Sequence, residues 1–171
     1  MRVVGYHGTS GADAARILAV GFTASRNDYD WLGDGAYFFQ DAPARAREWA
    51  RRRFPTDPAV VAAEIDLDGC IDLLDIRWNA VIRESYATLV KLLVRDGLPV
   101  PRQTVGAHRL DREVIEQTVG VLASAGVAVR SVRASFQEGK PLYPGSALYD
   151  ESHVQIAVRH PDAIIRTWRV K

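Results

Sequence analysis

Apolar side chains recur along this chain at two periods, one typical of helices and one typical of strands. Spacings of three or four residues predict helices over residues 12–20, 43–54, 78–95 and 111–124. Alternation or a short apolar run predicts strands over residues 3–6, 36–39, 61–67, 129–136, 154–158 and 164–170. The helices and strands interleave without a regular strand–helix–strand rhythm, and no Gly-x-Gly-x-x-Gly opens a helix after a strand. This pattern predicts an α+β domain rather than a doubly wound parallel sheet.

The first two predicted helices carry capping signals. Thr9, Ser10 and Asp13 are each suited to cap the start of the first helix. Asp41 is the expected cap of the second helix. The face of the second helix that we expect to pack on the core consists of Ala42, Ala46, Trp49, Ala50 and Phe54. Strict alternation over residues 61–67 predicts a strand with one buried face.

Size and composition narrow the class of protein. The chain has 171 residues, of which 47% are hydrophobic and 25% charged, so a disordered or fibrous chain is excluded. This length fits one domain, and we expect residues 1–171 to form it. The formal net charge of +1 provides no overall basic field for nucleic acid or an anionic membrane. No apolar signal region and no run of about 18 apolar residues occurs, so a cytoplasmic protein without a membrane segment is expected.

Neither a disulfide nor a metal site is expected. The one cysteine, Cys70, cannot form an internal disulfide, and we expect it to be a small buried side chain at a strand end. Cysteines and histidines do not cluster as zinc ligands do. The run Asp28-Tyr29-Asp30 offers too few oxygens for a calcium loop.

Three strand-associated segments carry candidate chemistry. Tyr6-His7-Gly8-Thr9-Ser10 places a histidine beside a glycine whose backbone a ligand can approach closely. Gly33-Asp34-Gly35-Ala36-Tyr37 brings an aromatic ring out of a glycine-rich turn, an arrangement that can stack a flat heterocycle. In the late strand, alternation puts His153 and Gln155 on one face. Each segment also has a purely structural interpretation: a capped helix start, a tight turn and a hydrogen-bonded strand.

Taken in order, these segments resemble the diphtheria-toxin-type ADP-ribosyltransferases, which include the catalytic domains of poly(ADP-ribose) polymerases. The matching stretches are residues 6–9, 17–22, 33–38 and 155–158, and they span nearly the whole chain. The resemblance implies two small, roughly perpendicular antiparallel sheets flanked by helices. It also implies a cleft that binds NAD as co-substrate without a metal.

The resemblance assigns roles to particular residues. His7 would hydrogen-bond a hydroxyl on the adenosine side of NAD, and Gly8 would pair its backbone with the nicotinamide carboxamide. Thr9 belongs to the same NAD-binding segment. Tyr37 would stack on the nicotinamide ring, and Trp49 would supply a second stacking aromatic. A core position on the apolar face of its helix is the alternative for Trp49.

The main departure from the family lies at Gln155, where the family has its catalytic glutamate. A glutamine amide can orient a ribose hydroxyl, but it carries no charge and cannot act as a base. We therefore expect transfer of a single ADP-ribose rather than chain elongation, with catalysis assigned to His7, Tyr37 and Gln155. Glu138 and Glu151 are auxiliary carboxylates, for which a solvated surface position is the alternative.

Arginines crowd the helix over residues 43–54, and a solvated face is the ordinary interpretation of such a run. Arg45 is a further auxiliary candidate, because its helix follows Tyr37 and one of these arginines could meet a pyrophosphate or a nucleic-acid acceptor.

The function that the resemblance implies is mono-ADP-ribosyl transfer from NAD to a macromolecule, protein or nucleic acid, with release of nicotinamide. A bacterial toxin or defence effector with an antitoxin or immunity partner would suit such a domain. Three alternatives stay open: an NAD hydrolase, an RNA 2′-phosphotransferase-like enzyme, and a catalytically silent module that binds NAD or ADP-ribose.

Overall fold

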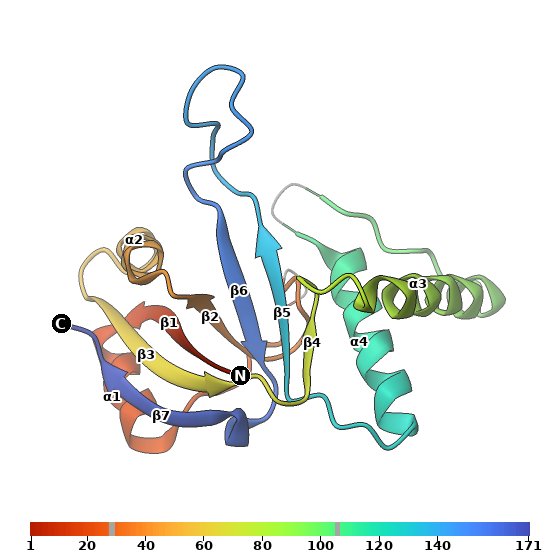
Figure 1. Ribbon diagram of the computed structural model, residues 1–171, viewed down its shortest axis with the longest axis horizontal. Coiled ribbons are helices and arrows are strands. Elements are labelled where there is room, and N and C mark those ends of the chain that lie inside the picture. The colour runs from red at the N-terminus through yellow and green to blue at the C-terminus, as the bar shows by residue number, and fades with distance from the viewer. Residues whose placement is uncertain (28–29, 105–106) are drawn as a thin grey trace.

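The computed structural model describes residues 1–27, 30–104 and 107–171, which form a mixed β-sheet with helices on both faces (Figure 1). The strands are β1 (Arg2–Ser10), β2 (Ala36–Gln40), β3 (Pro58–Asp66), β4 (Cys70–Asp72), β5 (Ser131–Phe136), β6 (His153–Val158) and β7 (Ile164–Arg169). The helices are α1 (Gly11–Val20), α2 (Pro43–Arg53), α3 (Trp78–Arg95) and α4 (Arg109–Ser124), with a 3₁₀ turn at Pro161–Ala163. The α+β class predicted from the sequence is therefore confirmed.

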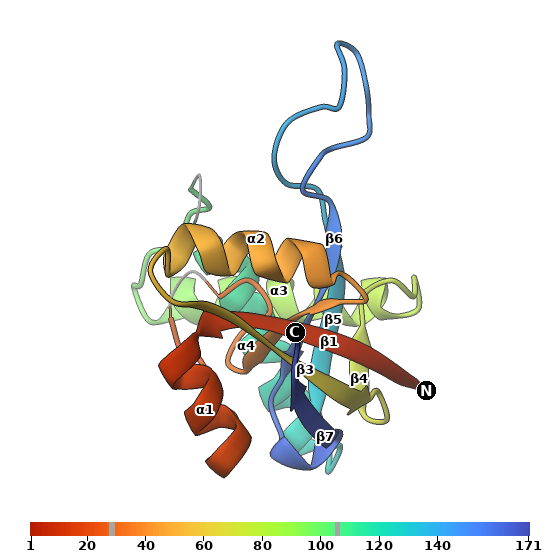
Figure 2. The same ribbon diagram turned by 90° about the vertical axis from the view of Figure 1, so that its left-hand side faces the viewer.

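The described residues form one seven-stranded sheet, in the order β4-β5-β6-β2-β1-β3-β7, so the expectation of two separate sheets is wrong. The reason is that β2 pairs with β6 on one side and with β1 on the other, which joins all strands. The β1–β2 pairing is short, with Gly5 opposite Gln40 and Tyr6 opposite Phe39. Figure 2 shows β1 and β3 running across the direction of β5 and β6, so the sheet is strongly twisted about this short pairing.

Helices α1 and α2 cover opposite faces of β3. From α1, Ala14 and Ile17 pack with Val61, whereas Ala46 of α2 packs with Val60 on the other face. Residues 59–63 are consequently buried without interruption, so the alternation predicted over residues 61–67 fails at Ala62. It holds over residues 63–67, where Glu64 and Asp66 are only partly buried. Alternation in the sequence cannot reveal that a second helix covers the remaining face.

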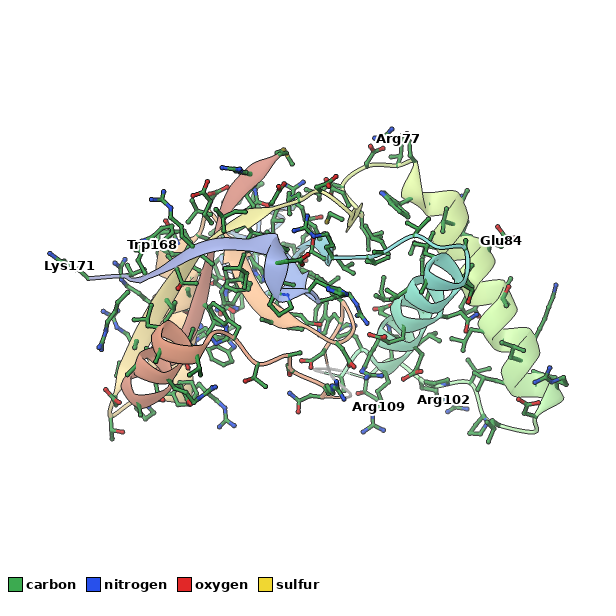
Figure 3. The ribbon with its side chains drawn as sticks, turned by 90° about the horizontal axis from the view of Figure 1, so that it is seen from below. Arg77, Glu84, Arg102, Arg109, Trp168 and Lys171 are labelled. Atoms are coloured by element: carbon green, nitrogen blue, oxygen red, sulfur yellow. The ribbon has the colours of Figure 1, made fainter. Side chains whose placement is uncertain are left out.

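The α3–α4 pair lies to one side of the sheet (Figure 3). Ile115 of α4 packs against Val132 of β5 and Ile71 of β4, and α3 packs mainly along α4. Within the described residues, no helix is long and apolar enough to cross a membrane. The single-domain prediction for residues 1–171 stays a prediction.

Element ends differ from the sequence prediction in small ways. Ser10 caps α1 by accepting a hydrogen bond from the main-chain N–H of Asp13. Asp41 does not cap α2: it takes a positive φ of 50°, and Ala42 occupies the cap position without a side-chain bond. The strand β4 was not predicted, because its three residues carry no periodic signal. The expectation that Asp28-Tyr29-Asp30 holds no calcium involves residues 28 and 29, which lie outside the described residues.

Candidate functional site

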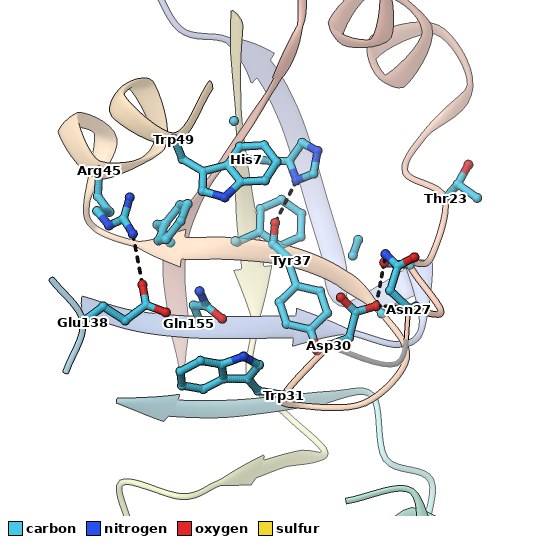
Figure 4. A pocket seen from close by; sticks show the side chains of 16 residues that line it. His7, Thr23, Asn27, Asp30, Trp31, Tyr37, Arg45, Trp49, Glu138 and Gln155 are labelled. Carbon is cyan, nitrogen blue, oxygen red and sulfur yellow. Dashed lines mark hydrogen bonds and ion pairs between the residues drawn. The ribbon is translucent and has the colours of Figure 1, made fainter. Parts of the chain in front are cut away.

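A cavity of about 340 Å³ opens where β1 and β2 separate beyond their short pairing (Figure 4). Its volume falls within the range of about 300–1,000 Å³ that is usual for small-molecule sites. Four elements (β1, β2, α2 and β6) and two connecting segments contribute to its wall. The lining residues are His7, Gly8, Thr23, Ser25, Asn27, Asp30, Trp31, Gly35, Ala36, Tyr37, Phe38, Phe39, Arg45, Trp49, Glu138 and Gln155.

His7 links the separating strands by its side chain. Its Nδ1 lies 2.8 Å from the carbonyl oxygen of Tyr37, beyond the last β1–β2 residue pair. Because a carbonyl oxygen only accepts, Nδ1 carries the proton, and in the neutral ring Nε2 is then an acceptor. Burial lowers the pKa of His7 below its ordinary value of 6.5, so the ring is neutral near pH 7. Phe22 packs edge-on against this ring, with 5.3 Å between the ring centroids.

Tyr37 is held by its hydroxyl as well as by β2. The hydroxyl donates to the carbonyl of Gly33 (2.7 Å) and accepts from the N–H of Leu32 (3.0 Å). Burial raises the pKa of Tyr37 well above its ordinary value of 10, so the hydroxyl stays protonated. The ring therefore lies in the cavity wall in a fixed orientation and presents an apolar surface rather than an acid or a base.

Two tryptophans complete the aromatic wall. The side of α2 next to its buried alanines brings Trp49 to the cavity, and the residue is 38% exposed, so the alternative of a core tryptophan is wrong. Trp31 lines the cavity from the segment before β2 and packs against His108 and Phe136. In the view of Figure 4, Gln155 lies between Trp49 and Trp31. Sequence reasoning missed Trp31; its one signal was a large aromatic in an otherwise polar turn.

Gln155 projects from β6 into the cavity. Among the described residues its side-chain amide has no hydrogen-bond partner, which leaves both a donor and an acceptor for a ligand. His153, two residues earlier, is buried against Phe39 and donates from Nδ1 to the carbonyl of Glu151 (2.6 Å). The two residues predicted to share a face thus differ in role, because the cavity reaches Gln155 but not His153.

Arg45 forms ion pairs with both auxiliary glutamates, Glu138 and Glu151. Its guanidinium lies 3.0 Å from Glu138 and 2.8 Å from Glu151, and its side chain is 11% exposed. Glu138 lines the cavity together with Arg45. Glu151 does not line it and also bonds Arg52, and this bond lowers the pKa of Glu151 below its ordinary value of 4.5. A solvated surface position is therefore wrong for Glu138, Glu151 and Arg45, which form one partly buried ion-pair cluster. Within this cluster, the charges of Glu138 and Arg45 meet at the cavity edge.

The far end of the cavity is polar and was not predicted. Asp30 is 8% exposed and accepts hydrogen bonds from the Ser25 hydroxyl (2.6 Å) and the N–H of Asn27 (2.8 Å). Thr23 lines the same end. Periodicity could not indicate these residues, because they belong to an irregular segment. A ligand spanning the cavity would meet aromatic rings at one end and hydroxyl and carboxylate groups at the other.

The remaining predicted residues lie close by. Gly8 lines the cavity, and α2 packs directly on it: a Cβ at this position would lie 2.5 Å from the carbonyl oxygen of Ala46. Thr9 is buried and does not line the cavity. Cys70 begins β4 in a partly buried position, where burial raises the pKa of its thiol to about 11. No group of three or more metal-ligating side chains occurs in the described part of the chain, and the expectation of no metal stays a prediction.

A scan against protein-family models finds no match to this chain, and a search of curated proteins finds no matching sequence. The candidate function therefore depends on the residues of the cavity.

Proposed function

We propose that the cavity binds NAD and that the protein transfers a single ADP-ribose from it to a macromolecular acceptor. The observation that supports this proposal is that residues distant in the sequence lie together in the fold. His7 and Gly8 of β1, Tyr37 of β2, Trp49 of α2 and Gln155 of β6 are far apart in the sequence, yet all line one cavity. The resemblance to the ADP-ribosyltransferases rests on the sequence alone, and it assigns roles to these same residues.

In the proposed complex the nicotinamide ring stacks between Tyr37 and Trp49. Tyr37 is suited to this role because its hydroxyl bonds fix the ring before a ligand arrives. The neutral His7 offers Nε2 as an acceptor for a ribose hydroxyl. The polar end at Asp30 provides a carboxylate for further hydroxyl groups.

The reaction breaks the bond between C1′ of the ribose and the nicotinamide nitrogen, and nicotinamide leaves with the electron pair. The acceptor nucleophile then bonds C1′ and loses a proton. Between these events C1′ carries positive charge, which a nearby carboxylate stabilises. Gln155 orients the ribose hydroxyl through its unpartnered amide. Glu138, held at the cavity edge by Arg45, is the carboxylate that this mechanism uses for the charge.

The test is incubation of the purified protein with NAD labelled in its adenylate part and a cell lysate. Label in protein or in nucleic acid supports transfer and identifies the acceptor class. Gln155→Ala should abolish this labelling, whereas Gln117→Ala, a change on α4 outside the cavity, should not. Gln155→Glu should release nicotinamide about ten to a hundred times faster, since each 1.4 kcal/mol or so of transition-state stabilisation is tenfold.

A second candidate function follows from the missing charge at Gln155. A neutral amide in the cavity would serve a module that binds NAD or ADP-ribose without cleaving it. Binding by calorimetry together with no turnover in both the wild type and Gln155→Glu would favour this function. Free ADP-ribose as the sole product would instead mark a hydrolase.

A further inference from the structure

Outside the cavity, one ion pair binds both main-chain groups of a single residue, Asp34, in the turn that precedes β2. Glu116 of α4 accepts a hydrogen bond from the N–H of Asp34 (2.7 Å) and pairs bidentately with Arg159 (2.8 and 2.9 Å). Arg159 also donates to the carbonyl of Asp34 (3.0 Å). Both main-chain groups of Asp34 are thus bound by the same carboxylate–guanidinium pair.

The opposite side of this turn is bound by Tyr37. Its hydroxyl bonds the carbonyl of Gly33 and the N–H of Leu32, the two residues that precede Asp34. The turn therefore lies between the Glu116–Arg159 pair on its outer side and the Tyr37 ring on the cavity side. Any shift of the Asp34 backbone moves the groups that fix the ring.

Contacts at Gly33 indicate how closely the turn and the ion pair fit. Gly33 has a φ of 77°, and a Cβ there would lie 2.2 Å from the Glu116 Oε1 atom. Arg112 adds a bond to the Asp34 side chain (2.7 Å), so α4 contacts this one residue through two charged groups. The turn is thus fixed by α4, a helix that lies outside the cavity wall.

We propose that Glu116, acting with Arg159, is a positioning residue: it fixes the Asp34 backbone and thereby sets the orientation of the Tyr37 ring that receives the ligand. This inference rests on the proposed function for the identity of the ligand, NAD. The link from Glu116 to Tyr37 does not depend on that identity. Glu116 of α4 thereby supports the ligand site although it does not line the cavity.

The first measurement uses ligand-free protein with isotope-labelled tyrosine rings, with the Tyr37 resonance assigned by its loss in Tyr37→Phe. Glu116→Gln keeps the shape of the side chain but removes the charge that binds Arg159. We expect the Tyr37 resonance to shift and broaden in this variant. Glu113→Gln is the matched control, because Glu113 lies on the same helix and pairs with Arg112 at 2.8 Å without bonding the Asp34 backbone. An unchanged Tyr37 resonance in folded Glu116→Gln protein would overturn the proposal.

The second measurement is NAD affinity by calorimetry. Glu116→Gln and Arg159→Lys should each weaken binding about tenfold, since a small displacement of a positioning group is costly. In Tyr37→Phe the ring is no longer tied to Gly33, so adding Glu116→Gln should cause little further loss. Additive losses in this double variant would contradict the proposal. If the wild type binds no NAD while the Tyr37 resonance still moves in Glu116→Gln, the positioning role stands and the proposed function fails.

Discussion

Two histidines, the partly buried His7 and the buried His153, are expected to make the stability of the protein sensitive to mild acid. Each donates from Nδ1 to a main-chain carbonyl, and burial lowers the pKa of each below its ordinary value of 6.5. In the unfolded chain both titrate near that ordinary value. Below about pH 6.5 the unfolded state therefore binds more protons than the folded state, and stability falls as the pH falls.

We expect the free energy of unfolding to decrease between pH 7 and pH 5, measured by urea unfolding at several pH values. The carboxylates with lowered pKa are Asp66, Asp75, Glu116 and Glu151, whose ordinary values are 3.8 for Asp and 4.5 for Glu. Their contribution to stability is lost only below those values, so the window from pH 7 to pH 5 isolates the histidines. His7→Gln should flatten the pH dependence. His160→Gln changes an exposed side chain and should leave the slope as it is. Equal slopes in all three proteins would contradict the assignment.

Among individual residues, the sequence indicated the cavity residues on the strands better than those in the neighbouring turn. His7 stands beside a glycine, Tyr37 follows a glycine-rich turn, and Gln155 lies on an alternating strand, so each has a local signal in the sequence. Trp31 and Asp30 were missed, because nothing local indicates which way a turn residue points. Trp49 was open to two interpretations, since helical spacing does not separate the centre of an apolar face from its edge.

Among the elements, α2 connects packing to the site. It approaches β1 so closely that Gly8 has no room for a side chain, and this approach brings Trp49 and Arg45 to the cavity. A helix held at this distance fixes the cavity width on one side.

Gly8→Ala should destabilise the protein by about 1–3 kcal/mol, as overpacking of a filled site does. The added methyl would meet the backbone of α2, which cannot move aside as a flexible side chain can. Gly120→Ala is the matched control: a Cβ there meets nothing within 4 Å among the described residues, and α4 should gain about 0.5–1 kcal/mol. Urea unfolding measures both changes, and equal effects of the two substitutions would argue against close packing at Gly8.

The long segment between β5 and β6 extends beyond the sheet (Figures 1 and 2). Ion pairs hold the base of this segment. Arg45 forms these pairs with Glu138 near the start of the segment and Glu151 near its end. The tip exposes Leu142, Tyr143 and Leu148. Such a segment is anchored by a few charges rather than by a core.

Arg45→Met should therefore loosen this segment while the apolar stem of the side chain still packs. Limited proteolysis should cut between residues 138 and 151 several times faster than in the wild type, because cleavage follows local opening. Arg51→Met is the control on the same helix, since Arg51 has no ion-pair partner among the described residues. If the two variants are cut at the same rate, the anchor lies elsewhere.

For the whole molecule, the sequence predicted the class of fold but not its strand order. Periodicity located six of the strands and the four helices, because each depends on local spacing. It could not show that β2 joins two groups of strands, since pairing depends on residues more than a hundred positions apart. The two-sheet expectation came from the resemblance, and the short β1–β2 pairing corrects it.

The strand order also determines when the site is completed as the chain is synthesised. His7, Tyr37 and Trp49 lie in the first third of the chain, but β2 receives its second neighbour only when β6 has been made. Pairing between such distant segments is slow compared with local contacts. A nascent chain that ends before β6 therefore carries most of the aromatic wall and lacks the strand of Gln155. The cavity is assembled only when the last part of the chain is available.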